Sequence, residues 1–509
     1  MPRNTARVPR QRLEAFPDVS FADPRVKFAD MSGDGLQDIA VVYEGRIDYW
    51  PNLGYGRWGH RITTALPTRL PQNFDPQRVL LGDVDGDGLA DLLYVSDREV
   101  TLWINRTGHA WSNPITIRGT PAVNTMVTVR LADLQGTGVP GVLWTREANG
   151  NGRPQHYFLD FTGGVKPYLL NRMDNNLGAV TEVTYASSTK FYLRDQASPN
   201  TSWRTTLPFP VHVVERVTVR DELSGGTLTT EYRYHHGYWD GEEREFRGFG
   251  MVEQLDTEVF DGYAGRALPG DREELRRRRQ QQSFSPAVLT RTWFHQGPVD
   301  PADDGHWQEL DWSGIDGSST QRPGGHRPAD EYWSGDPNLL AHTKAVNQFL
   351  KTVAPAARRD ALRALRGSIL RSELYALDGS PLQDRPYTVT EHAYDLREES
   401  QPTDSDSTRQ RIFFPFRTAQ RTTQWERGDD PMTQFSFTNS YDDYGQPLSQ
   451  TSIAVPRGRD FRVAVASREP YLAMHTVTSY AQRDDGERYI VDRAASATSY
   501  QIPNDGSAS

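Results

Sequence analysis

Three stretches in the first third of the chain repeat one pattern, in which an apolar segment leads through an aspartate-rich loop into a second apolar segment. They read FADMSGDGLQDIAVVYEGRIDYWPN, LGDVDGDGLADLLYVSDREVTLWIN and LADLQGTGVPGVLWTREANGNGRPQHYF. Their loops open at Asp30, Asp83 and Asp133, which are 53 and 50 residues apart. A period near 50 residues of short strands is typical of β-propeller blades, and no helical stripe fits inside it.

The repeats also define how much of a propeller to expect. In the first two copies a tryptophan and an asparagine recur at matching offsets, as Trp50 with Asn52 and Trp103 with Asn105. Propellers close with roughly four to eight blades. Since three are recognisable, either other blades have lost the motif or part of the propeller lies outside the chain. We expect a partial arc over residues 22–165, after an extension of residues 1–21, and expect the chain to be a fragment.

The loops have the ligand spacing of a calcium site. Oxygens at positions 1, 3, 5 and 9, with a backbone carbonyl at position 7 and glycine at position 6, can surround a hard cation. In the second loop these are Asp83, Asp85, Asp87, the Leu89 carbonyl and Asp91; in the first they are Asp30, Ser32, Asp34, the Leu36 carbonyl and Asp38. The sequence predicts structural Ca²⁺ at the second loop and, with one carboxylate fewer, at the first. The third keeps only Asp133 and is expected to hold none.

Other interpretations of the loops follow from the same residues. An EF-hand needs glutamate at position 12, which Val41 and Tyr94 occupy inside apolar segments. A catalytic metal is not expected, because no histidine accompanies either loop and no HExxH motif occurs. The open alternative is a turn without metal, in which the aspartates cap backbone amides.

Charge and composition exclude several classes of protein. The formal charge of −10 argues against a nucleic-acid surface, which needs a concentrated basic face. The chain has no cysteine, which excludes disulfides and thiolate sites. No apolar run is long enough to span a bilayer, and the basic N-terminus lacks the apolar stretch of a secretory signal. Any export is therefore expected to use a route other than a signal peptide.

Beyond residue 165 the pattern changes to long alternating segments. GAVTEVTYASSTKFYL and FPVHVVERVTVRDELSGGTLTTEYRYHHGYWDGEEREFRGFGMVEQLDTE are typical of long antiparallel strands. Residues 337–370 have helical spacing, with a break at Ala354-Pro355. From residue 371 to 509 strands resume, and YALDGSPLQ and NSYDDYGQPLSQTSIA carry the pattern of tyrosine-aspartate (YD) repeats. The predicted fold is mainly β, a partial propeller followed by a large curved antiparallel sheet with a short helical insertion.

Several motifs resemble known families. The aspartate loops resemble the integrin-alpha-like calcium blade repeat, called FG-GAP or VCBS, in which the ion ties strands together and does no chemistry. STKFYL, LPFPVHVVERV, YHHGYWDGEEREFRGFGMVEQLDTE and TRTWFH resemble the middle region of the B subunit of bacterial insecticidal toxin complexes, related to the Salmonella virulence plasmid B protein. The resemblance runs from about residue 22 to 460, with residues 166–336 as the β-rich middle region.

This resemblance implies a non-catalytic scaffold. In such complexes a B and a C subunit build a hollow Rhs/YD-repeat shell around the cytotoxic end of C, and the propeller docks on a channel-forming A subunit for translocation. The implied partners are therefore a C-type toxin subunit and an A-type channel subunit, acting outside the bacterium that makes them. The alternative function is a calcium-dependent adhesive or ligand-binding propeller on a β-stalk.

Enzymatic interpretations are weaker. Ser187 followed by Glu243 and Glu245 in ExE spacing superficially resembles an ADP-ribosyltransferase, but common polar residues recur by chance. His235 and His236 are adjacent, and neighbouring residues on a strand point to opposite faces, so a packed or partner-facing role is expected. No GxSxG elbow and no phosphate loop occurs. We expect no catalytic residue.

Overall fold

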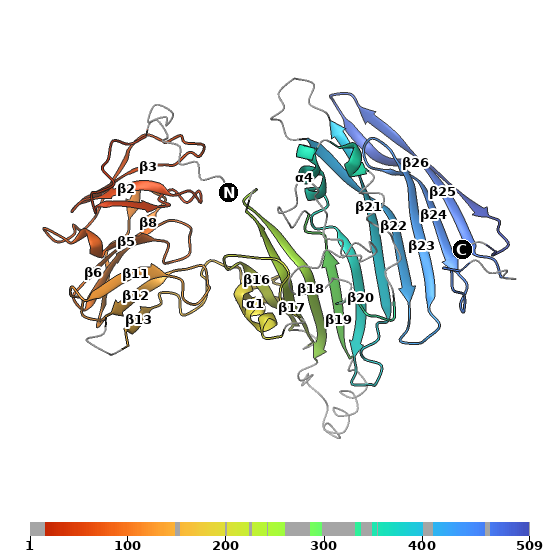
Figure 1. The fold of residues 1–509 in the computed structure, drawn as a ribbon, viewed down its shortest axis with the longest axis horizontal. Helices are drawn as coiled ribbons and strands as arrows, with labels where there is room; N and C mark the ends of the chain where they lie inside the picture. The colour runs from red at the N-terminus through yellow and green to blue at the C-terminus, as the bar shows by residue number, and fades with distance from the viewer. Residues whose placement is uncertain are drawn as a thin grey trace. The chain divides into compact units, whose positions relative to one another are not determined.

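The computed structural model describes residues 16–147, 153–198, 201–222, 226–241, 243–259, 286–297, 331–336, 349–353, 355–400, 411–463 and 469–507. The chain divides into two compact units, residues 1–170 with 209–212, and residues 171–208 with 213–509. Each unit is β-rich (Figure 1). Among the described residues no helix is long and apolar enough to cross a membrane.

The first unit consists of three small antiparallel sheets in the described part of the chain. The first contains β1 (Val26–Ala29), β2 (Asp38–Val42), β3 (Arg46–Trp50) and β4 (Ile62–Ala65). The second contains β5 (Val79–Gly82), β6 (Asp91–Ser96), β7 (Glu99–Trp103) and β10 (Ile115–Arg118), with the short pair β8 (Asn105–Arg106) and β9 (Ala110–Trp111) beside it in sequence. The third contains β11 (Val127–Ala132), β12 (Gly141–Arg146) and β13 (Gln155–Leu159). Three repeats thus give three blades, as predicted.

The blades are held together by apolar side chains between neighbouring sheets. Every residue of β2 is buried, and so are the first five of β6, because a central strand packed on both faces requires a continuous apolar run. One core joins the first two sheets, through residues such as Ile47, Leu92 and Trp103. A second joins the second and third sheets, through Leu93, Val142 and Trp144. The cores therefore fix each aspartate loop at the end of a buried strand.

The second unit is one large antiparallel sheet. Its described strands are β14 (Arg172–Asp174), β15 (Ala179–Ser187), β16 (His212–Asp221), β17 (Thr227–Asp240), β18 (Glu245–Val259), β19 (Ala287–Phe294), β20 (Ile369–Leu377), β21 (Thr388–Ser400), β22 (Ile412–Gln424), β23 (Met432–Tyr441), β24 (Pro447–Val455), β25 (Leu472–Asp484) and β26 (Tyr489–Ile502). These 13 strands lie in the order of the sequence, each paired with its neighbours. Figure 1 shows the sheet curving from β16 to β26. The mainly β fold and the large antiparallel sheet are confirmed.

One segment predicted as strand is a helix. The prediction continued the strand through STKFYL, but β15 ends at Ser187 and α1 (Ser188–Gln196) follows. The Ser187 hydroxyl caps the helix by accepting the Thr189 amide at 3.3 Å. Its buried residues, Ser188, Phe191 and Asp195, follow helical spacing, so the strand interpretation mistook one helical face for alternation.

The helical insertion is described only in part. Residues 337–348 and Ala354 lie outside the described residues, as does the arginine run 276–279. The described helix α4 (Pro355–Arg363) begins at the predicted break. It buries Ala361 and Leu362 against Leu396 and Phe413 of the sheet. The prediction of helix up to residue 370 is wrong at its end, because β20 already begins at Ile369.

Candidate functional site

The second aspartate loop, between β5 and β6, closes on its first aspartate. Asp83 accepts the Gly86 amide at 2.6 Å through Oδ1 and the Gly88 amide at 2.9 Å through Oδ2. Gly86 and Gly88 have φ of 83° and 93°, in the left-handed region that favours glycine. Asp87, at position 5, accepts the Leu89 amide at 2.8 Å. Carboxylate-to-amide hydrogen bonds within the loop therefore stabilise this turn.

The last aspartate of this loop is fully buried. Asp91 accepts the Val84 amide at 3.1 Å and the Asn105 amide at 2.8 Å. Burial raises the pKa of Asp91 to about 7, and the negative charges of Asp85 and Asp83 add to the shift. Because the pKa of Asp91 is raised above its usual 3.8, ionising this buried carboxyl lowers the folding stability as the pH rises towards 7, unless a cation takes the place of the proton. The loop therefore has an electrostatic reason to bind a cation at neutral pH.

Three of the predicted ligands lie together. Carboxylate oxygens of Asp83, Asp85 and Asp91 are within 4.8 Å of one another, and no other such group of acidic, histidine or cysteine side chains occurs in the described part of the chain. Asp87 is not a member of this group. Leu89, whose carbonyl is the predicted ligand at position 7, lies in the same turn, and its amide donates to Asp87. A hard cation would thus meet three carboxylates without rearrangement of the loop.

The first loop has the same hydrogen bonds but a weaker set of ligands. Asp30 accepts the Gly33 and Gly35 amides, each at 2.7 Å, and Asp34 accepts the Leu36 amide at 2.9 Å. Asp38 is buried, which raises its pKa, and it accepts the Met31 and Asn52 amides at 3.0 and 2.8 Å. Ser32 supplies a hydroxyl where the second loop has Asp85.

The third loop has no room for an aspartate at position 9. Asp133 accepts the amides of Thr137 at 3.1 Å and Gly138 at 2.7 Å, and of these only Gly138 matches a position used in the other two loops. Position 9 is Gly141, where a Cβ would lie 2.3 Å from the Leu159 carbonyl oxygen. An aspartate cannot replace this glycine without moving β13.

The recurring asparagines have a role that the repeat pattern alone did not assign. The Asn105 side chain donates to the carbonyls of Ala90 and Met31, both at 3.1 Å, and so links the second loop to the first blade. Asn52 donates to the Gln37 carbonyl at 3.1 Å. Their backbone amides bind the buried aspartates Asp91 and Asp38. The asparagines are therefore part of the support for each loop.

The second unit contains a feature that sequence reasoning missed, a row of charged residues of alternating sign across the sheet. In direct register from β17 to β20 lie Arg233, Glu253, Arg291 and Glu373, and from β20 to β22 lie Arg371, Glu391 and Arg421. We call this set the charge row. Direct partners, and residues two apart on one strand, share a face of a sheet, so all seven lie on one face.

The centre of the charge row is buried. Arg371 contacts Glu373 and Glu391, both at 2.7 Å, and Arg421 contacts Glu391 at 2.9 Å; these four side chains are at most 2% exposed. The end of the row on β17 is exposed to solvent, since the Arg233 side chain is 53% exposed. Buried charges are tolerated only when paired in this way, so the row fixes which residues of neighbouring strands face each other.

A short segment, residues 331–336, covers this centre. Asp336 accepts from Arg421 and, at 2.6 Å, from the Trp425 indole. The Trp333 amide donates to Glu373 at 3.0 Å, and Tyr332 lies under the Arg371 guanidinium at 4.7 Å. The segment therefore completes the hydrogen bonding of the buried charges.

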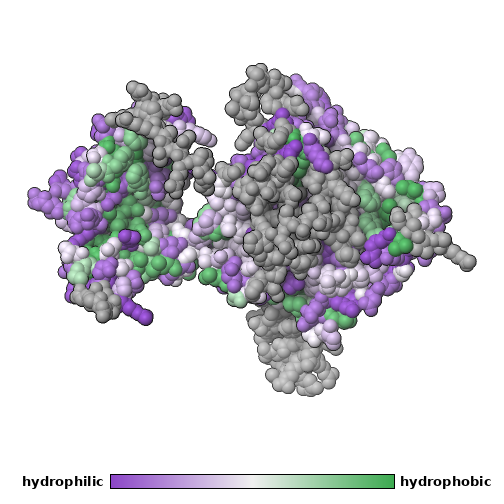
Figure 2. Space-filling model, viewed as in Figure 1, coloured by the Kyte–Doolittle hydropathy of each residue, from purple (hydrophilic) through white to green (hydrophobic). Residues whose placement is uncertain are grey.

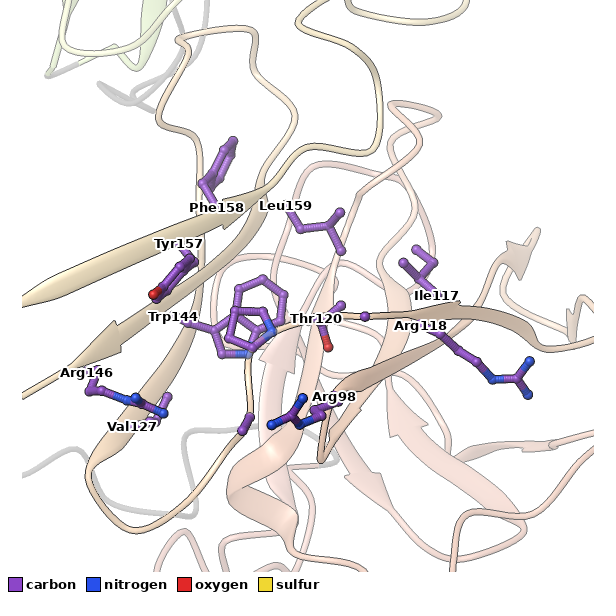
Figure 3. A pocket seen from close by; sticks show the side chains of 13 residues that line it. Arg98, Ile117, Arg118, Thr120, Val127, Trp144, Arg146, Tyr157, Phe158 and Leu159 are labelled. Atoms are coloured by element: carbon purple, nitrogen blue, oxygen red, sulfur yellow. The ribbon is translucent and has the colours of Figure 1, made fainter.

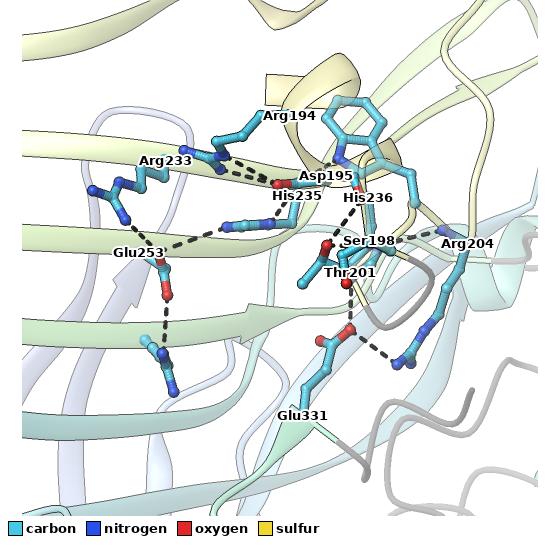
Figure 4. Close-up of polar contacts among 12 residues, drawn as sticks. Arg194, Asp195, Ser198, Thr201, Arg204, Arg233, His235, His236, Glu253 and Glu331 are labelled. Carbon is cyan, nitrogen blue, oxygen red and sulfur yellow. Dashed lines mark hydrogen bonds and ion pairs between the residues drawn. The ribbon is translucent and has the colours of Figure 1, made fainter. Parts of the chain in front are cut away.

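The two histidines bind different carboxylates (Figure 4). His235 Nδ1 lies 2.7 Å from Asp195 of α1, and His236 Nε2 lies 3.0 Å from Glu331. Both are buried. Strand alternation, the predicted reason for their separation, does not apply as stated, because His236 has a φ of 58° and leaves the extended conformation. Both side chains are packed within the fold, which is one of the two expected roles.

The residues of the transferase-like pattern are engaged in other contacts. The Ser187 hydroxyl caps α1. Glu245 lies 3.0 Å from Arg247 and 3.2 Å from Arg363 of α4, and Glu243 lies 3.4 Å from Arg363. These glutamates thus join α4 to the end of β18.

The charge of Glu331 should make the second unit sensitive to acid. Burial alone would raise the pKa of Glu331, but the hydrogen bond and charge of His236 and the charge of Arg204 outweigh it and lower the pKa to about 2. A lowered pKa adds stability above about pH 4.5, which is lost as the pH falls towards 2. Glu331→Gln should therefore cost about 3 kcal/mol of unfolding free energy at pH 7 and almost nothing near pH 2.

Urea unfolding of both proteins between pH 7 and pH 2 measures this difference. Glu182→Gln is the matched control, because Glu182 forms an exposed pair with Arg172 on the same sheet and should change stability by less than about 1 kcal/mol. A difference between wild type and Glu331→Gln that does not shrink in acid would contradict the proposed charge interaction.

Comparison with known proteins places these features in a family. The family described as insecticide toxin TcdB middle/N-terminal region matches residues 104–263, and the TcdB middle/C-terminal region matches residues 360–504. Together these two matches cover more than half of the chain. The FG-GAP-like repeat matches residues 30–94, which contain the first two aspartate loops.

Solved structures agree over almost the whole chain. The crystal structure of TcdB2-TccC3 without the hypervariable C-terminal region has a TM-score of 0.71 at 29% identity, covering 97% of this chain and 23% of that one. TcdB2-TccC3-Cdc42 has a TM-score of 0.70 at 29% identity over 94% and 22%. The Photorhabdus luminescens Tc holotoxin pore has a TM-score of 0.69 at 28% identity over 94% and 21%. The chain thus spans about a fifth of these chains. No curated protein matches it.

Proposed function

Because the chain belongs to the TcdB insecticide toxin family, of which it carries the two middle regions, we propose that it is a non-catalytic scaffold of a toxin complex. Its sheet unit encloses part of a cytotoxic C-type subunit, and its blades dock on an A-type channel subunit for translocation. The observation that carries this proposal is the match of nearly the whole chain to TcdB2 in structures that contain TccC3. A toxin of this kind acts outside the bacterium that makes it.

The exposed surface of the first unit supports docking. Figure 2 shows apolar residues gathered on its visible face. Phe21 and Phe28 stack at 5.6 Å although both are about half exposed, and Leu53 and Tyr55 are also exposed. Exposed aromatic and apolar groups near one another are typical of a protein-protein interface.

The last strands of the sheet support enclosure of a partner. Among the described residues β26 pairs only with β25, and nearly all of its 14 residues are exposed. Tyr489, Tyr500 and Ile502 are among them. A long free edge with apolar side chains is a template for a further strand. We assign this edge to the C-type subunit.

The polar groups of the second unit support a structural role. Glu243, Glu245, His235 and His236 all contact partners of opposite or complementary charge within the fold. The charge row is closed by residues 331–336. A sheet that encloses a partner protein must keep the register of its strands. Paired charges help because they specify which strand lies beside which.

Co-purification with the two partners tests the proposal. The chain, produced together with a C-type and an A-type subunit from the same toxin complex, should elute with both. Failure to associate with either partner would overturn the scaffold function.

Proline substitutions locate the contact with the C-type subunit. Consecutive N–H groups of a strand point to opposite edges, so of Ala497→Pro and Thr498→Pro one removes a hydrogen bond to β25 and the other faces the free edge. The variant that keeps wild-type thermal stability should lose the C-type subunit while retaining the A-type subunit. Retention of both partners by that folded variant would show that the edge is not the contact.

We further propose that Ca²⁺ binds the second loop as a structural ion, through Asp83, Asp85 and Asp91. The loop is already closed by amide hydrogen bonds, so the ion would neutralise three carboxylates rather than form the turn. The first loop, with Ser32 in place of an aspartate, is the weaker candidate.

Calcium should therefore stabilise the first unit. At free calcium ten times the dissociation constant, the gain is about 1.4 kcal/mol, and EDTA should reverse it. Asp85→Asn should weaken the response, because it removes one of the three negative charges at a residue that caps only one amide. Asp133→Asn is the matched control, since it changes a capping aspartate in the third loop and should leave the response intact. A melting curve of the wild type that is indifferent to calcium and EDTA would favour a turn without metal.

A further inference from the structure

A pocket of about 530 Å³ lies within the first unit, where the second and third blades meet (Figure 3). Arg98 reaches it from the turn between β6 and β7, and Thr120 follows β10. Trp144 and Arg146 belong to β12, and Tyr157 to β13. We call this site the interblade pocket.

Two hydrogen-bond donors in the wall of this pocket have no acceptor among the described residues. Trp144 is 1% exposed, and its indole Nε1 has no partner among the described residues. The Thr120 hydroxyl is likewise buried without a partner in the described part of the chain. Figure 3 shows both Thr120 and Trp144 among the side chains that line the pocket. Buried donors are nearly always satisfied in native proteins, so two at one pocket are groups to which a bound ligand could supply an acceptor.

Two positive charges stand at the rim. Neither the Arg98 nor the Arg146 guanidinium makes an ion pair among the described residues, whereas Arg118 on the same rim pairs with Glu99 at 3.2 Å. Figure 3 shows Arg118 extending away from Trp144, while Arg98 lies near it. The charge available to the pocket is therefore positive.

The position of Arg98 is built into the fold. Its φ of 57° is in the left-handed region, which is uncommon for a residue other than glycine. Its carbonyl accepts the amides of Gly119 and Thr120 at 3.0 and 3.2 Å, so the strained turn is tied to the segment that carries the Thr120 hydroxyl. Strained conformations that the surrounding structure holds in place are frequent at binding sites.

The remaining walls are apolar. Ile117, Val127, Leu159 and Tyr157 line the pocket beside the polar groups. We propose that the interblade pocket binds a carboxylate carried on an apolar body. The carboxylate oxygens accept from the Trp144 indole and the Thr120 hydroxyl, the arginines neutralise the charge, and the apolar body contacts the remaining walls. A guanidinium matches a planar carboxylate in two parallel hydrogen bonds, and a single negative charge suits walls of this kind.

Binding of N-acetylphenylalanine to the whole chain tests this site. The titration is followed by calorimetry and by the nitrogen-labelled indole signal of Trp144, identified as the one missing in Trp144→Phe. The neutral N-acetylphenylalanine amide is the matched ligand. A capped peptide with one internal glutamate, against its glutamine counterpart, distinguishes a peptide side chain from a free acid as the source of the carboxylate.

The acid should shift the Trp144 signal and saturate, and the amide should bind at least about tenfold more weakly, since it lacks the charge-assisted hydrogen bonds. Arg98→Gln and Arg146→Gln should each weaken the acid by about tenfold, and Arg118→Gln should not. Tighter binding of the glutamate peptide would identify a peptide source, and binding of the free acid alone a small-molecule source. Equal binding of acid and amide, no binding of either charged ligand, or an equal loss in Arg118→Gln would overturn the proposal; calorimetry on the arginine variants decides it if Trp144→Phe does not fold.

Discussion

Replacing Arg371 by alanine should lower the unfolding free energy of the sheet unit by about 4 kcal/mol, because it leaves buried carboxylates without their shared partner. Arg371 is 1% exposed and contacts Glu373 and Glu391, both at 2.7 Å. It also donates to the Asp336 carbonyl at 3.1 Å and lies over Tyr332. Arg421 can still pair with Glu391, but in the charge row Glu373 loses its closest cation.

Chemical unfolding followed by tryptophan fluorescence measures the effect. Arg216→Ala is the matched control, because Arg216 pairs with Glu231 on the same sheet at half exposure and should cost less than about 1 kcal/mol. Arg371→Lys keeps the charge but not the planar fork and should fall between the two. Equal unfolding free energies of Arg371→Ala and Arg216→Ala would show that the charge row does not stabilise the sheet.

Gly141→Ala should destabilise the first unit by about 3 kcal/mol, because the new methyl group meets backbone rather than a movable side chain. A Cβ at Gly141 would lie 2.3 Å from the Leu159 carbonyl oxygen and 2.5 Å from the Phe158 ring. Strand β12 would have to separate from β13, with which it pairs from Val142 onwards. The third blade should therefore lose its outer strand first.

Thermal and urea unfolding, with hydrogen exchange of β13 amides, measure this loss. Gly45→Ala is the control in the same unit, since its Cβ would meet only the flexible Arg69 side chain at 3.4 Å. A Gly141→Ala protein as stable as Gly45→Ala would show that the blade can relax around the methyl group.

The blades were predictable from sequence because each repeats a local rule. The apolar runs DIAVV and DLLYV are central strands buried on both faces, and the aspartate that opens each loop caps two amides of its own turn. Such features depend on residues a few positions apart, which the repeat displays directly. The grouping of the carboxylates was less predictable, since Asp87 has the spacing of a ligand yet lies outside the cluster of Asp83, Asp85 and Asp91.

The charge row could not be predicted, because its members meet only when neighbouring strands pair in the correct register. Glu391 meets Arg371 and Arg421, and Asp336 reaches Arg421 over 85 residues. A signal was present, since RSELY places charges at alternate positions and TRTWF and AQRTT each place one arginine inside a strand. Alternation alone assigns such positions to solvent, and only the pairing of neighbouring strands shows that these are buried.

Helix α1 was missed for a related reason. Over the six residues STKFYL, a pattern of one buried face is ambiguous between strand and helix. The Ser187 cap and the spacing of Phe191 and Asp195 identify the segment as a helix. The burial of Asp195, however, is explained only by contacts outside this segment, such as the one with His235 on β17.

The strand order of the second unit has a consequence for how the protein is made. Because each described strand from β15 to β26 pairs with the described strand before it in sequence, the sheet can grow from one end while the chain leaves the ribosome. Each completed hairpin offers its edge to the next segment, so no strand has to wait for a distant partner, and contacts close in sequence favour fast folding. A misplaced hairpin would then disturb its immediate neighbours and leave the strands already laid down intact.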